Sequence, residues 1–559
     1  MKRIIFSYPH ECCPDCHSRL RVYRTDSRPV KTVHGEFTAI HRIMTCPVDG
    51  KRFRSGGLDL IIPPGCTYAN DIMIEAATKR FLSGWSSSEI SSSLGVSGSH
   101  ARSLCNTALD IFHKIHEESI PKLKERMKSY ILQIDGTTDS EFSMIVAVRD
   151  AISGFVLRVK KCHSESQESI EKILQSAKDR FGIPSGITCD MRSGIISAAG
   201  KIFPGVPIRI CLMHFLRDLG KDLMDDLHRD LGMMINGAGI KSRLKTVLRS
   251  IPDYDQLTLE EIESGYCSSR ERMEIMAVRK VLENLVHVEG GSGYGFPFSL
   301  RHLNFFTACT GAGKELSDLA SVAENGEPAD LISEIMGHLS RITGSGMIRE
   351  TSGRLGDINS MIFRRIRGAF MIPERGNLSS DGIYVPLTDD PVVHERCTIV
   401  FGELEVYLNS NVEKHLFTAA KVAVDRYRKR ETMLFAQNPE GTIPRTNNGM
   451  EILFRKVRRN IRKRCGNIAT GSILAQSGEK LALFQDMGNQ EYTKIVFGSG
   501  YISAAFARHR KSFRKKVMTG KRIRELVGQG TRMMLEGSLG NTPYAPETME
   551  GYYEIYTNK

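Results

Sequence analysis

The sequence predicts a mixed α/β protein whose central sheet is interrupted by a long helical stretch. Two short apolar segments, 130–137 and 186–190, each carry an aspartate at or near their end. An amphipathic pattern over 166–181 lies between them, and residues 215–440 read mainly as helices with loops. The 559 residues are too many for one compact core, so three or more domains are expected.

The elements expected between residues 129 and 211 are three strands, a helix, a strand, a helix and a final strand. The strands are predicted at 130–137, 142–148, 155–159, 186–190 and 207–211, and the helices at 166–181 and 194–202. Helical crossovers link parallel strands. Asp135 and Asp190 are therefore expected on neighbouring strands, near the carboxyl ends where ligand sites form in open α/β sheets.

The charge balance points to a polyanionic partner. Lys and Arg number 77 against 64 Asp and Glu, a net charge of +13, and the pI is about 9.1. Seven basic and no acidic residues fall within Ile452–Gly466, and nine basic and no acidic residues within Arg508–Arg524. Such blocks are also common as solvated surface, but one of them directly follows a candidate catalytic carboxylate, which favours contact with nucleic acid phosphates.

The composition argues against a membrane protein or a disulfide-stabilised secreted protein. No apolar run is long enough to span a bilayer, and the apolar start of the chain turns polar at Ser7, too early for a signal peptide. The 13 cysteines are odd in number and mostly scattered, so a cytoplasmic protein with reduced thiols is expected. Four of them have apolar neighbours and are predicted to be core residues: Cys105, Cys162, Cys189 and Cys397.

Residues 1–57 are predicted to form a zinc-ribbon-like domain. Cys13 and Cys16 have the spacing of a metal knuckle, and Cys46 begins a second knuckle in which Asp49 stands where a cysteine is expected. Cys13, Cys16, Cys46 and Asp49 are the predicted zinc ligands. The fourth position stays open, since other donors are available and a ribbon without metal is the alternative. Those donors are Cys12, His34 and His41.

Residues 70–118 are predicted to contain a helix-turn-helix DNA-binding domain. Gly95 suits the left-handed turn between two helices, and Ser97 suits the N-cap of the second. Ala101 and Leu104 would face inward. The residues then left to reach DNA are His100, Arg102, Ser103 and Asn106. An ordinary helical hairpin within a core is the alternative interpretation.

A third carboxylate, Glu451, is predicted on a helix that begins near Asn447 or Asn448. An apolar stripe marks the buried face of this helix: Met450, Leu453, Phe454, Val457 and Ile461. Glu451 borders that stripe, and a basic row follows it, formed by Arg455, Arg458 and Arg462, with Arg459 beside them. The alternative is a surface helix in which Glu451 pairs with Arg455.

Asp135, Asp190 and Glu451 together fit the chemistry of phosphodiester cleavage. Two divalent ions about 3.5–4 Å apart can activate an oxygen nucleophile and stabilise a leaving oxygen. Mg²⁺ prefers hard oxygen ligands and keeps several waters, so a few carboxylates suffice. We therefore predict Mg²⁺, or Mn²⁺, as the catalytic cofactor.

Four motifs in this order resemble the DDE transposases of the Mutator-like and related bacterial insertion-sequence type. They are Ile134-Asp135-Gly136-Thr137, Thr188-Cys189-Asp190, Cys211-Leu-Met-His214 and Thr446-Asn-Asn-Gly-Met-Glu451. The likeness covers roughly 130–220 and 440–470. It implies an RNase H-like catalytic core interrupted by a large helical insertion, with Cys211 and His214 as a family motif of structural or DNA-positioning role. Asp49 and the length of the insertion depart from the family pattern.

The resemblance implies a nucleoid-associated transposase that binds transposon-end and target DNA as a homodimer or larger assembly. The domains it implies are 1–57, 70–118, 126–220 (first part of the core), 221–440 (insertion), 441–490 (second part of the core) and a basic region at 491–559. A catalytically inactive DNA-binding regulator and a structure-specific nuclease are the alternatives. His163 and Glu165 are secondary catalytic candidates.

Overall fold

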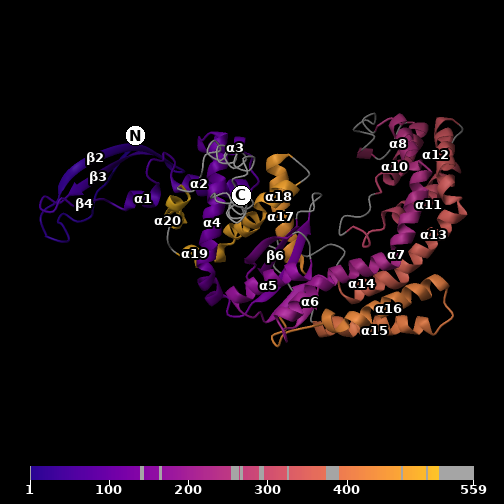
Figure 1. Cartoon of the computed structure of the whole chain (residues 1–559). Coiled ribbons are helices and arrows are strands. Elements are labelled where there is room, and N and C mark those ends of the chain that lie inside the picture. Colours follow the sequence, from indigo (N-terminus) through magenta and orange to yellow (C-terminus); the bar gives the residue numbers. More distant parts are fainter. Residues whose placement is uncertain are drawn as a thin grey trace, which may run out of the picture. The chain divides into compact units, whose positions relative to one another are not determined.

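The structure is a computed structural model of the chain. It describes residues 2–138, 144–162, 166–253, 263–264, 269–288, 295–323, 326–372, 390–466, 470–498 and 502–514. The described residues divide into two compact units, one built from residues up to Arg209 and from Gln437 onward, the other from residues between Ile210 and Ala436 (Figure 1). The described residues form a mixed α/β chain with two sheets.

The N-terminal sheet consists of β1 (Lys2–Phe6), β2 (Arg21–Thr32), β3 (Gly35–Thr45) and the short β4 (Arg52–Phe53). β3 is central: β1 pairs with it in parallel, and β2 and β4 pair with it antiparallel. Two small buried clusters hold this region. One is centred on Val30 and Ala39, and the other contains Cys13, Leu20 and Cys46.

Four helices follow: α1 (Gly57–Ile61), α2 (Asn70–Phe81), α3 (Ser87–Leu94) and α4 (Gly98–Arg126). The predicted turn chemistry between the last two is confirmed. Gly95 ends α3 in the left-handed region at φ 61°, and the Ser97 side chain accepts a hydrogen bond from the His100 backbone at the start of α4. Ala101 and Leu104 are buried, as predicted. α4 extends to Arg126, well beyond the length of a short recognition helix.

The main sheet has the strand order β7-β6-β5-β8-β9. Its strands are β5 (Ile131–Thr138), β6 (Met144–Asp150), β7 (Val156–Cys162), β8 (Gly186–Cys189) and β9 (Ile208–Ile210). β5, β6 and β7 are antiparallel neighbours, whereas β5 and β8 are parallel. The predicted strands and their sequence order are confirmed, although the start of the strand predicted at 142–148 lies outside the described residues.

Helices from both ends of the chain enclose this sheet. α5 (Gln167–Phe181) packs on α6 (Ser193–Ile202) and contacts β6 and β7. From the C-terminal part, α17 (Asn448–Cys465) contacts β5, and α18 (Gly471–Leu483) contacts β6 and β7. The 3-10 helix η3 (Phe484–Gly488), α19 (Gln490–Phe497) and α20 (Ile502–Arg514) then follow, and α19 and α20 pack on α4. One buried core runs through all of these elements.

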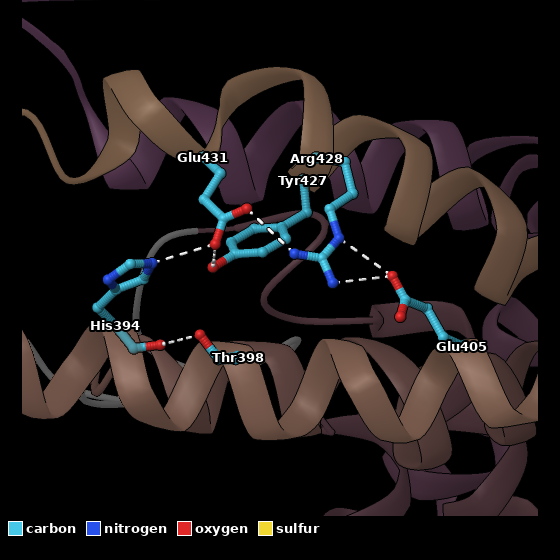
Figure 2. A network of polar contacts seen from close by, with 6 residues as sticks. All are labelled: His394, Thr398, Glu405, Tyr427, Arg428 and Glu431. Atoms are coloured by element: carbon cyan, nitrogen blue, oxygen red, sulfur yellow. Dashed lines mark hydrogen bonds and ion pairs between the residues drawn. The ribbon is translucent and has the colours of Figure 1, made fainter.

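The regular elements described in the second unit are helical, as predicted for this stretch. They are α7 (Leu212–Gly237), α8 (Ile240–Ser250), α10 (Arg270–Val286), α11 (Arg301–Ala320), α12 (Glu327–Thr343), α13 (Gly346–Asp357), the π-helix η2 (Ile358–Phe363), α14 (Arg364–Ala369), α15 (Asp390–Leu408) and α16 (Lys414–Leu434). Figure 2 shows a polar network that joins α15 and α16 around Glu431. Among the described residues, no helix combines the length and apolarity that a membrane crossing requires.

The predicted core cysteines are confirmed. Cys105, Cys162, Cys189 and Cys397 are all buried, with no more than 7% of their surface exposed. Burial raises the pKa of the Cys105 thiol to about 11, which keeps it protonated and unreactive at neutral pH.

Candidate active site

Asp135 lies within β5 and Asp190 directly follows β8, and these strands are parallel neighbours. The register pairs Gln133 with Thr188, so each aspartate stands two residues beyond a member of the same pair. Side chains alternate between the two faces of a sheet, which places Asp135 on the face of Gln133 and Asp190 on the face of Thr188. Neighbouring strands are about 4.8 Å apart, so the two carboxylates start from adjacent positions.

A segment of the C-terminal part crosses the sheet on this same face. Side chains of three different strands, Thr188, Gln133 and Arg209, donate hydrogen bonds to carbonyl oxygens of the segment Ile443–Thr446. The acceptors are, in that order, Pro444 at 3.2 Å, Thr446 at 3.4 Å and Ile443 at 3.1 Å. The chain that leads into α17 is thereby fixed across the strands that carry the aspartates.

Asn447 continues this attachment at the start of α17. Its side-chain Nδ2 donates to the carbonyl oxygen of Ile134, 2.8 Å away. The predicted start of the helix near Asn447 or Asn448 is confirmed, and Asn447 stands at the N-cap position without a side-chain capping bond. The amide instead ties α17 to the residue that precedes Asp135.

Gly449 allows α17 to approach the sheet closely. A Cβ atom at this position would lie 2.0 Å from Nη1 of Arg149 and 2.7 Å from Oε1 of Gln133. Any larger residue would therefore push the helix start or these side chains away. Glu451 lies two residues further along α17, whose first turn packs against β5 and β6.

Beside this turn lie two buried ionisable side chains, Arg149 and Asp486. Arg149 donates through Nε to the carbonyl oxygen of Gly154 at 2.8 Å, and Asp486 accepts from the backbone N–H of Val156 at 3.1 Å. Burial lowers the pKa of Arg149, although the negative charge of Asp486 acts to raise it. Burial also raises the pKa of Asp486 well above its ordinary value. These groups support the sheet beside the helix start.

The three candidate carboxylates differ in exposure. Asp135 is 8% and Asp190 5% exposed, whereas the Glu451 side chain is 33% exposed. Asp135 accepts from the N–H of Gly136 at 2.8 Å, and Asp190 accepts from both the backbone and Nε of Arg192 at 3.1 Å. Backbone N–H groups thus orient both aspartates. The carboxylate oxygens are hard metal ligands, which suit Mg²⁺ or Mn²⁺.

The predicted apolar stripe of α17 is buried, but its basic row divides among different surroundings. Arg455 is exposed and lies 3.9 Å from Glu451, which is the pairing that the alternative interpretation expects. Arg458 is half-buried and donates to Thr137 Oγ1 and to the Thr138 carbonyl oxygen at the end of β5. Arg458 therefore braces the strand that carries Asp135. Arg459 and Arg462 are exposed.

A groove of about 890 Å³ runs along another face of α17. The groove is lined by Lys456, Arg459 and Lys463, at helical spacings of three and four residues, and by residues of the stretch Gln485–Glu491. The sequence prediction included Arg459 but missed Lys456 and Lys463. Their spacing would have identified a second basic face of the same helix.

The four DNA-binding candidates of α4 do not share one environment. Arg102, Ser103 and Asn106 are exposed, as a DNA-reading face requires. His100 is half-buried, its ring packs on Tyr68 with centroids 4.8 Å apart, and burial lowers its pKa. His100 thus belongs to the packing between α4 and the preceding segment.

Cys211 and His214 lie where β9 passes into α7. Cys211 is 2% exposed and stands at the N-cap position of α7, and its carbonyl oxygen accepts from Phe215 at 3.0 Å. His214 lies in the first turn of that helix and is half-buried. His163 and Glu165 lie outside the described residues.

The cysteines of the N-terminal domain form a group that can hold a metal ion. The sulfur atoms of Cys13, Cys16 and Cys46 all lie within 4.8 Å of one another, and Cys16 and Cys46 are 3.4 Å apart. Cys13 and Cys46 are each 1% exposed. A second group with suitable side chains lies in the other unit, formed by Asp357, Glu413 and His415. There His415 is already paired with both carboxylates, at 3.3 and 3.2 Å.

Sequence reasoning missed the residues that hold the site together. Gln133, Thr188 and Arg209 fasten the 443–446 segment, yet each is a single polar residue within a strand pattern. Arg209 is fully buried, which no local signal indicated. No protein-family model and no curated protein matches this sequence.

Proposed function

We propose that the protein is a DDE transposase that binds transposon-end DNA and catalyses metal-dependent phosphodiester hydrolysis and strand transfer. The observation that carries the proposal is the Gln133–Thr188 pairing of parallel strands, from which Asp135 and Asp190 are each displaced by two residues. Two acids at neighbouring positions of parallel strands, on a face crossed by the segment leading to a third, offer hard oxygen donors to a divalent cation.

The sheet order supports an RNase H-like core. Three antiparallel strands, β7, β6 and β5, are followed by β8 in parallel beside β5, with α5 as the crossover between β7 and β8. The helical stretch between β9 and α17 then acts as an insertion. In this proposal the hydrogen bonds of Ile443–Thr446 and Asn447 hold the chain against the sheet after that insertion, which brings Glu451 back beside the core.

The three acids have different roles in this proposal. Asp135 and Asp190, buried and oriented by backbone N–H groups, hold fixed positions, and Glu451 completes the set from a more exposed helix. These three carboxylates would hold a divalent cation, which would supply the charge that activates an oxygen nucleophile and stabilises the leaving oxygen. Arg458 keeps the end of β5 in place through Thr137 and Thr138.

DNA contact is assigned to surfaces that carry exposed basic and polar groups. Arg102, Ser103 and Asn106 on α4 present a polar face for sequence reading, and Arg455, Arg459 and Arg462 on α17 present phosphate ligands. The groove with Lys456 and Lys463 extends the second surface. Joining two DNA ends requires at least two copies of the chain, so we propose a homodimer or larger complex on DNA.

Zinc is the metal proposed for the cysteine group.

The test is cleavage and joining of a DNA fragment that carries the sequences flanking this reading frame in its source genome. With Mg²⁺ or Mn²⁺ we expect nicked ends and joined products. Asp135→Asn, Asp190→Asn and Glu451→Gln each should lower both activities by about 100-fold or more, since they remove direct metal ligands. Asp179→Asn, at an exposed position on α5, is the matched control and should retain activity.

The alternatives are separate outcomes of this assay. DNA binding by the unsubstituted chain without cutting in either metal would indicate a non-catalytic regulator. Cutting without joined products would indicate a structure-specific nuclease. Wild-type cutting by Asp190→Asn would refute the assignment of the site itself.

A further inference from the structure

The cysteine group of the N-terminal domain has three sulfur atoms, one short of a closed tetrahedral zinc centre. We propose that Asp49 is its fourth ligand, which makes a centre of three thiolates and one carboxylate. This proposal concerns the N-terminal domain alone and does not rest on the activity proposed above.

The two knuckles have matching backbone hydrogen bonds. In the first, His17 N–H donates to the Cys13 carbonyl oxygen at 2.9 Å, and in the second, Gly50 N–H donates to the Cys46 carbonyl oxygen at 3.0 Å. A further bond closes each turn in the opposite direction: Cys13 N–H donates to Ser18, and Cys46 N–H donates to Lys51, both at 2.9 Å. The two turns therefore repeat one another residue by residue.

This repeat places Asp49 where Cys16 stands. Cys16 is the fourth residue of the first turn and Asp49 the fourth of the second. The next residue is left-handed in both, with φ 57° at His17 and 69° at Gly50. A left-handed histidine is uncommon and persists only where the surrounding structure enforces it. The shared conformation gives the fourth residue of each knuckle an equivalent backbone position.

Distances agree with a shared centre. Cys13 Sγ lies 3.9 Å from Asp49 Oδ2, and Cys16 Sγ lies 3.4 Å from Cys46 Sγ. Around a zinc ion with bonds of about 2.0–2.3 Å, tetrahedral ligand atoms are roughly 3.5–3.8 Å apart. These two separations are close to that spacing. The Asp49 carboxylate does not lie within 4.8 Å of all three sulfur atoms, so its side chain must turn toward them to complete the centre.

The other candidate donors are placed less well. Cys12 is exposed, and its backbone bridges to Arg19. His41 lies within β3, paired with Phe6 and Asp26, and His34 lies in the turn between β2 and β3. Among the described residues, neither histidine groups with any of the three cysteines, whereas Asp49 groups with Cys13.

Asp15 is the remaining rival, since it groups with Cys13 and Asp49. It occupies a middle position of the first knuckle, is exposed, and forms an ion pair with Lys51. A metal knuckle uses its first and fourth residues, so Asp15 is expected to stay outside the centre. Replacing each aspartate separately distinguishes the two.

The experiment uses the full chain, loaded with Zn²⁺ or with Co²⁺ as a spectroscopic substitute. We expect one equivalent of tightly held zinc, and a cobalt spectrum of a tetrahedral site with three thiolates. Asp49→Ala should weaken metal binding at least about 10-fold. Asp49→Cys should bind more tightly and raise the thiolate charge-transfer absorption by about a third, because a fourth thiolate joins three. Asp15→Asn should match the unsubstituted chain.

Three results would overturn the proposal. They are a chain that retains neither zinc nor cobalt, an Asp49→Ala variant with unchanged affinity and spectrum, and an Asp49→Cys variant whose charge-transfer absorption does not rise. Because Asp49→Cys restores a complete ligand set, it keeps the test decisive even where Asp49→Ala fails to fold.

Discussion

The side-chain amide of Asn447 donates a hydrogen bond to the carbonyl oxygen of Ile134 across 2.8 Å, and the two residues are 313 positions apart in the sequence. Ile134 directly precedes Asp135, and Asn447 directly precedes the helix that carries Glu451. One buried contact thus joins the two parts of the chain that supply the candidate acids.

Asn447→Ala should lower the free energy of unfolding by about 1–3 kcal/mol, because a fully buried amide and its hydrogen bond are lost. DNA cleavage should fall as well, since Glu451 is no longer held at its place beside β5. Urea unfolding and the cleavage assay measure the two effects. Asn448→Ala, at the neighbouring half-buried position, is the control and should change stability by less than about 0.5 kcal/mol. Equal effects of the two variants would contradict the role given to Asn447.

Gly449→Ala should destabilise the protein by about 1–3 kcal/mol, because the added Cβ meets Arg149 and Gln133 in a closely packed place. Gly353→Ala is the matched control. Gly353 is an exposed glycine within α13 whose added Cβ meets nothing within 4 Å, so alanine there should stabilise the helix by about 0.5–1 kcal/mol. Opposite signs in urea unfolding support the close approach of α17 to the sheet, and a stabilising Gly449→Ala would refute it.

The strand pattern was predictable because each strand carries its own local signal. Asp135 and Asp190 follow from apolar runs and crossovers, and their common level follows from parallel pairing. The attachments made by Thr188, Arg209 and Asn447 were not predictable, since their partners lie 256, 234 and 313 residues away and the choice is made by packing. His100 shows the same limit: its position on α4 suits DNA contact, but Tyr68 covers its ring.

The pH dependence of stability should contain a contribution from His116. Burial lowers the pKa of this histidine from 6.5 to about 4, and its ring nitrogens contact the Tyr492 hydroxyl at 2.8 Å and the Leu157 carbonyl oxygen at 3.4 Å. In the unfolded chain, His116 therefore binds a proton below about pH 6.5. In the folded chain, it binds that proton only below about pH 4.

The contribution of His116 is fully present above pH 6.5 and is lost as the pH falls toward 4, by up to about 1.4 kcal/mol per pH unit. His116→Gln removes this titration, so its unfolding free energy should fall less steeply with acid than that of the unsubstituted chain. The difference between the two slopes, from urea unfolding at a series of pH values, isolates His116 from other groups. Parallel curves between pH 6.5 and 4 would contradict the assignment.

The network between α15 and α16 should depend on Glu431 more than on Glu405. The Glu431 carboxylate accepts from His394 at 3.1 Å, from the Tyr427 hydroxyl at 3.0 Å and from Arg428 at 3.2 Å (Figure 2). Burial acts to raise the pKa of Glu431, but these donors together lower it. Glu405 shares Arg428 but is more exposed, 41% against 24% for the Glu431 side chain.

Glu431→Gln should accordingly lower the unfolding free energy by about 1–3 kcal/mol. Glu405→Gln should lower it by less than about 1 kcal/mol, because exposed ion pairs contribute little. Unfolding by urea compares the variants directly, and a larger loss for Glu405→Gln would show that Arg428, rather than Glu431, is the centre of the network.

Neighbouring arginines of α17 should separate DNA affinity from support of the site. Arg459 is exposed in the basic groove, whereas Arg458 is half-buried and donates to Thr137 and Thr138. If Arg459 contacts a phosphate, Arg459→Ala weakens binding to any duplex and reduces the salt dependence of the binding constant by about one unit of slope. Arg458→Ala should leave that slope unchanged but reduce cleavage, since the end of β5 beside Asp135 loses its brace.

Fluorescence anisotropy with a labelled duplex over a range of salt concentrations, together with the cleavage assay, measures both. An unchanged slope for Arg459→Ala would remove the groove from the DNA-binding surface, and a lowered slope for Arg458→Ala would show that this arginine leaves the strand to bind phosphate.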